Sequence, residues 1–260
     1  MPDTYTHGHQ ESVLRSHRWR TAANSAAYLL PHLRSGMTLL DVGCGPGTIT
    51  RDLATLVAPG RVVGIDRAES VIESAASPGP VDFRVGDVYA LDAADGSFDV
   101  VHAHQVLQHL SDPVAALTEM RRVLAPGGIL AVRDSDYGAF LWAPDAPRLD
   151  RWREIYTEVC RRNDADANAG RHLPEWVAAA GFTGLEVSSS NWTFADAGSR
   201  TWWGGLWADR TTGSAFSGQA VDYGVASADE LADVADGWRQ WAAGDDGLFV
   251  VVHVEVLARP

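Results

Sequence analysis

Three glycines at alternate positions, Gly43, Gly45 and Gly47, follow the apolar run at residues 39–42. Such a run predicts a buried strand, and glycines remove side chains where the backbone must come close to a ligand. The helix predicted over residues 48–57 begins with N–H groups that have no partner inside the helix. The pattern therefore predicts a turn that binds a nucleotide.

The spacing distinguishes two kinds of nucleotide-binding turn. A dinucleotide-binding turn has the pattern G-x-G-x-x-G, whereas the residue three positions beyond Gly45 is Thr48. Pro46 has no N–H group to offer to a pyrophosphate. An NAD-dependent oxidoreductase and a purely structural turn therefore stay as disfavoured alternatives.

The string D-V-G-C-G-P-G-T at residues 41–48 resembles motif I of the class I S-adenosylmethionine (SAM)-dependent methyltransferases. The resemblance is specific over about residues 36–135, and the type it is most similar to is the small-molecule type of the ubiquinone and menaquinone C-methyltransferases. It implies SAM as cofactor and S-adenosylhomocysteine (SAH) as product. The Pro-Pro-aromatic motif of DNA amino-methyltransferases and the Pro-Cys nucleophile of pyrimidine C5 enzymes are absent, so small-molecule methylation is expected.

Strands and helices alternate through this region. Their spacing predicts a parallel sheet with right-handed crossovers, whose carboxyl edge binds the ligand. The expected fold is α/β, a Rossmann-like doubly wound, mostly parallel sheet. The strands are expected at residues 38–42, 61–66, 81–87, 98–104 and 127–135, and the helices at 48–57, 68–76 and 112–124.

The flanking regions are expected to form an N-terminal helical lid and a helical cap insertion. An apolar stripe predicts one helix over residues 11–33. Beyond Ser135 we expect two helices, the first ending near residue 163 and the second near 182, with the small, polar stretch 164–170 as a linker. Further expected elements are a strand at 184–194, helices at 199–212 and 227–243, and a strand at 248–258 that the resemblance implies is antiparallel. The expected single domain divides into a lid (1–35), a SAM-binding core (36–135), a cap (136–246) and a final strand (247–260).

Two carboxylates end strands where a nucleoside is expected. Asp66 can accept hydrogen bonds from both ribose hydroxyls, and it also suits a helix cap. By resemblance, Asp87 and the N–H of Val88 face the adenine, and Asp41 orders the turn or contacts the methionine amino group. Arg20 suits the methionine carboxylate, or a solvated helix face. The full predicted cofactor set is Arg20, Asp41, Gly43, Cys44, Gly45, Asp66, Arg67, Asp87, Val88, His104 and Gln105.

Histidines are the candidate general bases, because their usual pKa lies near neutral pH. We rank His7 first, then His104 and His172. His102 and His104 share one face of a strand, but the strand end lacks the acids of metal-dependent O-methyltransferases, so we expect no metal. His109 is expected to serve packing.

The acceptor site is expected in the lid and the cap. Tryptophans are concentrated in the cap, where Trp202, Trp203 and Trp207 could wall an aromatic pocket or form a core. The predicted substrate set is Tyr5, His7, Asp134, Arg171, Trp202, Trp203 and Trp207; His9, His17, Trp19 and Tyr28 are further lid candidates.

Composition excludes other classes of partner. A net charge of −13 without a Lys or Arg cluster argues against nucleic acid. The polar N-terminus and the lack of a run of about 20 apolar residues argue against secretion and membrane insertion. With two cysteines and no disulfide framework, a cytoplasmic protein is expected. The assembly state, a homodimer included, stays open.

Together these features predict methyl transfer from SAM to an electron-rich aromatic carbon, in an indole or a phenol of secondary metabolism. N- or O-methylation of another small metabolite is the first alternative. The second alternative is a protein that binds SAM without transferring a methyl group.

Overall fold

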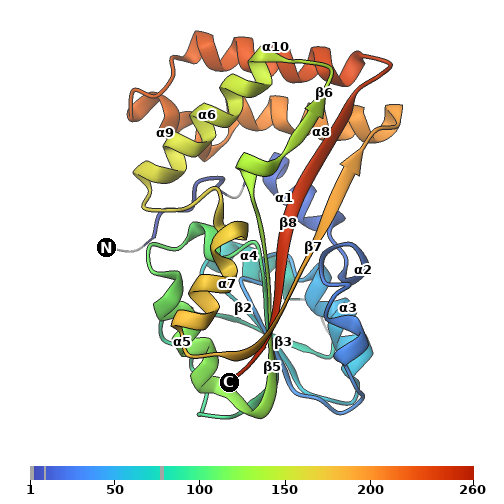
Figure 1. Cartoon of the computed structure of the whole chain (residues 1–260), viewed down its shortest axis with the longest axis vertical. Helices are drawn as coiled ribbons and strands as arrows, with labels where there is room; N and C mark the ends of the chain where they lie inside the picture. Colours follow the sequence, from blue (N-terminus) through green and yellow to red (C-terminus); the bar gives the residue numbers. More distant parts are fainter. Residues whose placement is uncertain (1–2, 9, 77–78) are drawn as a thin grey trace.

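The computed structural model describes residues 3–8, 10–76 and 79–260. Within them one eight-stranded sheet runs in the order β3-β2-β1-β4-β5-β8-β6, and β7 pairs with β8 beside this path. Figure 1 shows the sheet below and a layer of helices above it. The strands are β1 (Leu39–Val42), β2 (Val62–Asp66), β3 (Val81–Val85), β4 (Phe98–His104), β5 (Leu124–Ser135), β6 (Leu141–Ala143), β7 (Thr183–Phe194) and β8 (Leu248–Arg259).

The first five strands are parallel, and the last strand runs against them. β1 pairs in parallel with both β2 and β4, which puts their carboxyl ends at one edge. β8 is antiparallel to β5, β6 and β7, as expected for the final strand. Because β7 and β8 are each twelve residues long, they run from the sheet up to the helical layer (Figure 1). They therefore join the two halves of the molecule.

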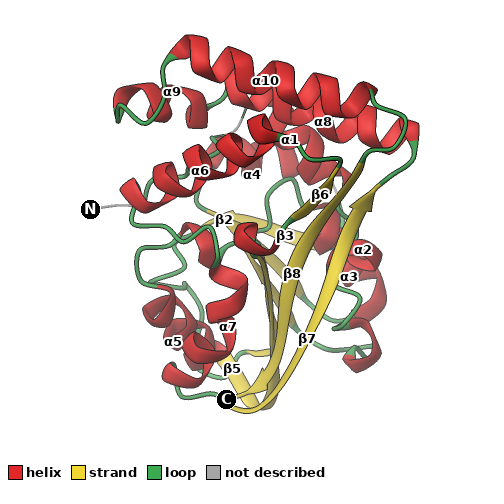
Figure 2. Ribbon diagram, turned by 45° about the horizontal axis from the view of Figure 1, so that its top comes forward, coloured by secondary structure: helices red, strands yellow, loops and turns green. Residues whose placement is uncertain are grey.

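Helices cover both faces of the sheet, with α5 and α7 on one side and α2 and α3 on the other (Figure 2). The buried residues of α3, Ile49, Leu53 and Val57, recur every four positions, so one face of this helix packs on the sheet. The helices are α1 (Glu11–Trp19), α2 (Ala22–Ser25), α3 (Thr48–Val57), α4 (Glu69–Ala75), α5 (Pro113–Val123), α6 (Pro147–Arg162), α7 (Ala169–Ala179), α8 (Ala197–Gly213), α9 (Ala215–Asp222) and α10 (Ala228–Ala243).

The single helix predicted over residues 11–33 was wrong. Arg20 has an extended backbone, with φ −72° and ψ 135°, which ends α1. Thr21 then caps α2 reciprocally with Asn24, because the side chain of each accepts from the backbone N–H of the other. The break lets the polypeptide turn beside the carboxyl edge of the sheet.

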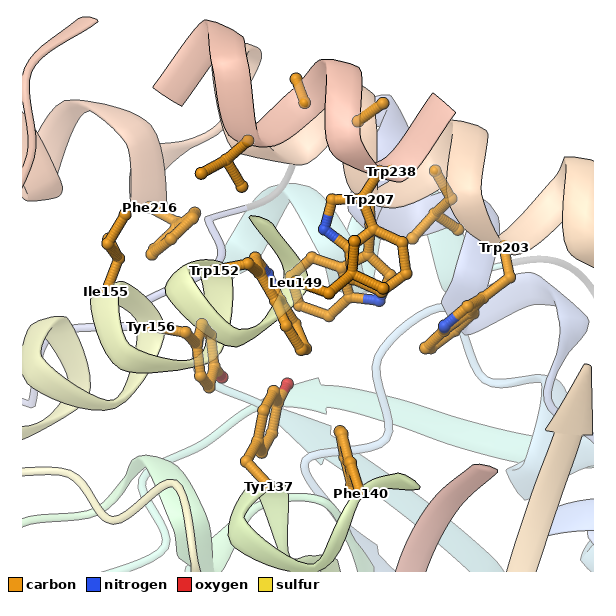
Figure 3. Close-up of a cluster of buried hydrophobic side chains, with 14 of the residues drawn as sticks. Tyr137, Phe140, Leu149, Trp152, Ile155, Tyr156, Trp203, Trp207, Phe216 and Trp238 are labelled. Carbon is orange, nitrogen blue, oxygen red and sulfur yellow. The ribbon is translucent and has the colours of Figure 1, made fainter. Parts of the chain in front are cut away.

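The cap has a core of its own, built largely from aromatic side chains (Figure 3). Trp152, Trp207 and Trp238 are each at most 1% exposed. The Trp152 ring centroid lies 4.5 Å from that of Trp207 and 4.9 Å from that of Trp238, both in edge-on contact, a favourable aromatic geometry. A Cβ at Gly204 would come within 2.9 Å of the Trp238 carbonyl oxygen, so this glycine lets α8 and α10 pack closely.

Most predicted elements are present with bounds within a few residues, but two were missed. These are strand β6, which has only three residues, and helix α9. The stretch 164–170 is not a free linker, because Ala167 and Ala169 are buried and α7 begins at Ala169. Within the described part of the chain, every helix is too short or too polar to cross a bilayer.

Candidate functional site

A cavity of about 720 Å³ lies where the strands end, beneath the cap. The glycine turn and the ends of β2 and β3 line one half of it. The N-terminal segment and the cap line the other half, through residues that include Tyr5, His17, Tyr137 and Trp207. The position at the carboxyl edge of the sheet is the one that the parallel strands predict.

The glycine turn has a backbone that favours glycine. Gly43, Gly45 and Gly47 all have positive φ, at 67°, 55° and 76°. A Cβ at Gly43 would collide with Val106, whereas a Cβ at Gly45 would have His17 Nδ1 as its nearest atom, at 3.8 Å. The backbone at Gly45 therefore faces open space in the cavity.

Asp66 lies beside this turn, as predicted. Its Oδ2 accepts from the Gly45 N–H at 3.1 Å, and its Oδ1 accepts from the Ala68 N–H at 3.0 Å. Asp66 also lines the cavity, so the carboxylate that braces the turn lies where a ligand can bind. Asp87 accepts from the Tyr89 N–H at 3.0 Å and lines the same half with Val88.

Asp41 supports the turn from below. Its Oδ1 lies 2.7 Å from His102 Nδ1, and its Oδ2 accepts from the Thr50 hydroxyl at 2.5 Å. Since Asp41 is 2% exposed and both oxygens have partners, its contacts favour the loop-ordering role over direct recognition of an amino group. They also hold His102 in the core, where the described His, Cys, Asp and Glu residues form no group of three that could hold a metal.

Arg20 and Gln105 meet at the centre of the cavity wall. Arg20 Nη2 donates to Gln105 Oε1 at 2.6 Å, and Gln105 Nε2 donates to His253 Nε2 at 2.8 Å. Gln105 has a φ of 54°, the left-handed region that side chains rarely adopt. Desolvation lowers the pKa of Arg20 to about 10, so the side chain is still a cation at neutral pH. Arg20, the residue predicted to bind a ligand carboxylate, is therefore a charged donor whose orientation Gln105 fixes.

His7 lies where the lid meets the cap. Its Nε2 is 2.9 Å from the Tyr156 hydroxyl, which is in turn hydrogen bonded to Tyr137. His7 Nδ1 is buried without a hydrogen-bond partner among the described residues. Burial holds the pKa of His7 well below its usual value, so the ring is neutral at pH 7 and one ring nitrogen carries a free lone pair.

His104 and His109 also line the cavity. His104 is 6% exposed, and its Nδ1 lies 3.5 Å from Arg133 Nη1. Burial lowers the pKa of both rings, that of His109 to about 3. His109 packs edge-on against Tyr5 at 4.7 Å, so the expected packing role coexists with a place in the cavity wall.

Aromatic rings form the cap half of the wall. Trp203 and Trp207, both predicted, line the cavity together with Trp192, Tyr137 and Phe140. Trp203 and Trp207 are at the same time part of the cap core, so the two interpretations of this cluster hold together.

Four residues of the predicted catalytic and substrate sets lie outside the cavity, as does the lid candidate Tyr28. The exposed Arg171 pairs with Asp136 at 2.6 Å, and His172 lies 3.6 Å from Asp166 on the outer side of α7. Asp134 is fully buried beneath the wall, and Trp202 packs on Trp19 with ring centroids 5.3 Å apart. Contrary to expectation, none of these side chains lines the cavity: Ser135 does so in place of Asp134, and the polar residues of α7 pair with Asp136 and Asp166. His9 lies outside the described residues.

Sequence reasoning missed Tyr137, Tyr156, Trp192 and Arg210. Arg210 carried a signal, since Trp203, Trp207 and Arg210 share one face of a helix at spacings of four and three. Tyr156 had none, because its partner His7 lies 149 positions away in the chain.

The cavity fits SAM. Carboxylates of Asp66 and Asp87 line one end, a glycine backbone lies open beside them, and the Arg20 cation lies beyond. Asp66 matches the ribose hydroxyls of that molecule, Asp87 the adenine, and Arg20 the methionine carboxylate.

Comparisons with known proteins agree with this geometry. A family model described as a methyltransferase domain matches residues 33–181. An uncharacterised methyltransferase of Schizosaccharomyces pombe is 30% identical over 97% of this chain and 95% of its own length. The protein named "Probable methyltransferase ltbC" of Aspergillus luteorubrus is 30% identical over 98% of this chain and 97% of its own length. A solved Haemonchus contortus phosphoethanolamine N-methyltransferase in complex with S-adenosyl-L-methionine has a TM-score of 0.59 and 16% identity, over 96% of this chain and 57% of that one.

Proposed function

Since this chain belongs to the class I SAM-dependent methyltransferases, it methylates a small molecule with SAM as cofactor, and we propose that the acceptor is an electron-rich aromatic carbon, in an indole or a phenol. The observation that carries the proposal is the aromatic wall of the cap half, formed by Trp192, Trp203 and Trp207 with Tyr137. Flat apolar rings favour a flat apolar acceptor by stacking and edge-on contacts.

When bound, SAM supplies an electrophilic methyl group. The protein's part is to hold the acceptor in line with that group and to exclude water. The carboxylates of Asp66 and Asp87 bind the nucleoside end, and Arg20, oriented by Gln105, binds the carboxylate end. Both ends are then fixed, and the acceptor side of the cavity faces the cap.

As general base, His7 accepts the proton that the aromatic carbon releases. With Tyr156 donating to Tyr137, His7 donates Nε2–H to Tyr156, and Nδ1 keeps its lone pair. The neutral imidazole also favours a second candidate function, O-methylation of a phenol, in which the same atom takes the hydroxyl proton. In both cases the N-terminal segment acts as the lid, because Asp3, Tyr5 and His7 line the cavity.

The test is product analysis with methyl-labelled SAM and a panel of indoles, phenols and aliphatic amines. We expect SAH release with aromatic acceptors and a label on ring carbon. A label on oxygen would favour the second candidate, and equal turnover of aliphatic amines would contradict both. Binding of SAM without any SAH release across the panel would favour the non-methylating alternative.

A further inference from the structure

Arg210 is a buried cation on the acceptor side of the cavity. It lies on α8, is 4% exposed and lines the cavity next to Trp207, whose ring centroid is 5.1 Å from the guanidinium carbon. Removing a charge from water costs several kcal/mol unless it is paired, so the partners of Arg210 decide what it does.

All the partners of Arg210 within the described residues are neutral. Nε and Nη2 donate to the Ser12 carbonyl oxygen at 3.3 and 3.2 Å, and Nη2 also donates to the Val13 carbonyl oxygen and the Ser16 hydroxyl. Nη1 has no partner there. The adjacent acid, Asp209, pairs instead with the exposed Arg15 at 3.2 Å. One edge of the guanidinium is therefore anchored to α1, and its charge is left without a counter-charge.

The acids that line the cavity are engaged elsewhere. Asp3 accepts from Ser111 at 3.0 Å, and Asp66, Asp87 and Asp41 hold the nucleotide end as described above. The cavity wall also holds a second cation, the half-buried Arg20, and the charges of both arginines lower the pKa of His7. One SAM carboxylate can pair with one arginine, which leaves the other to a second anion.

We propose that Arg210 binds a carboxylate carried by the aromatic acceptor, so that the substrate class is an aromatic acid. The inference rests on the proposed function for the aromatic part of the acceptor. The unpaired Nη1 provides two N–H donors, and the Trp207 ring beneath the guanidinium provides the surface on which the acceptor's ring packs. A neutral acceptor would leave this cation buried and unpaired.

The test is calorimetric titration of the full-length protein, saturated with SAH, with matched acids and amides near pH 7. The probes are indoleacetic acid with indoleacetamide, and benzoate with benzamide. For at least one pair we expect the acid to bind about tenfold or more tightly than the amide, as a charged hydrogen bond implies. Equal affinities within both pairs, or no binding of either acid, would overturn the proposal without any variant.

Two variants assign the preference to Arg210. Arg210→Gln should abolish the preference for the acid and leave SAH affinity within about twofold, because the charge is lost on the acceptor side. Arg15→Gln is the matched control, since Arg15 joins the same two helices through an exposed pair and should change neither. A preference that survives in Arg210→Gln would overturn the proposal, and a melting curve checks that this variant folds.

The experiments distinguish failure of the proposed carboxylate binding by Arg210 from failure of the proposed function. Methylation of neutral indoles with no preference for acids would overturn the acidic class and leave methyl transfer to aromatic carbon intact. Arg210-dependent binding of acids that are never methylated would overturn the aromatic methylation and leave the binding site intact.

Discussion

The Nε2 atom of His7 lies 2.9 Å from the hydroxyl of Tyr156, which joins the N-terminal segment to α6 across 149 positions of sequence. Of the two residues, His7 lines the cavity, and Tyr156 holds its ring in place. Because Tyr156 is itself bonded to Tyr137 at the end of β5, the three side chains connect the lid, the cap and the sheet. A histidine on a terminal segment is thereby fixed in the wall.

His7→Ala should lower turnover at least tenfold and leave SAM affinity nearly unchanged, because general bases contribute about 10²–10⁴-fold to rate and the ring lies away from the glycine turn. The measurement is steady-state turnover with the best acceptor beside a SAH titration.

Tyr156→Phe is the matched variant, since it keeps the ring and removes only the hydroxyl that orients His7. We expect an intermediate loss of turnover, with the pH dependence shifted. Undiminished turnover in His7→Ala would exclude this residue as the base.

Asp66→Ala should weaken SAM binding by about 1.5–3 kcal/mol, because hydrogen bonds between the carboxylate and the ribose hydroxyls are lost. The same change frees the Gly45 N–H, which Asp66 now accepts at 3.1 Å, so part of the loss is expected to come from the turn. Calorimetry with SAM and SAH measures the effect. An unchanged affinity would mean that Asp66 serves only to hold the backbone of the turn.

The sequence predicted the part of the site that local spacing controls. The glycine turn, Asp66 and Asp87 follow strand ends whose periodicity is visible in a few residues, and all of them line the cavity. Arg20 and Gln105 were also predicted. The hydrogen bond between them was not predicted, because it depends on the break between α1 and α2. The apolar stripe of this segment predicted one continuous helix, and packing beside the sheet favours two.

The acceptor side was predicted less well, because it is built from long-range contacts. Arg210 lines the cavity, and Tyr156 contacts the lining residue His7, from helices whose orientation depends on the packing of the tryptophan core. His172 and Arg171 had suitable chemistry, yet α7 rotates them toward Asp166 and Asp136. A residue's type indicates what it can do, and only the packing of its helix decides what it faces.

Arg20→Gln should weaken SAH binding about tenfold or more, because a charged hydrogen bond to the ligand carboxylate is lost. Arg20→Lys should recover only part of the affinity, since an ammonium cannot hold both Gln105 and a carboxylate in one plane. Arg18→Gln is the control, because Arg18 pairs with Glu11 on the exposed side of α1. Equal SAH affinities for all three variants would place the carboxylate elsewhere.

Trp238→Ala should destabilise the fold by about 3–5 kcal/mol, as expected for a buried tryptophan. Trp238 is fully buried in the cap core and does not line the cavity, so SAH affinity of the folded fraction should stay the same. The measurement is urea unfolding. A loss below 1 kcal/mol, well under the usual cost of such a cavity, would mean that the cap core is loosely packed.

Acid should destabilise the folded protein, starting below about pH 6.5, the usual pKa of histidine. Burial lowers the pKa of five histidines, that of His109 to about 3, so the unfolded state binds more protons in this range. The free energy of unfolding then rises with pH, and each such group removes up to about 1.4 kcal/mol per pH unit as the pH falls. The five are His7, His17, His104, His109 and His253.

One buried acid acts in the opposite direction. Burial raises the pKa of Asp134 to about 8, so its proton favours the folded state at low pH and this contribution is lost as the pH rises toward 8. Because one such group opposes five, we expect urea unfolding at pH 7 and pH 5.5 to show a net loss on acidification. His109→Phe should reduce that loss by one histidine's share. A stability that is flat or rises on acidification would show that the five rings accept protons without unfolding, and so are not held neutral by the fold.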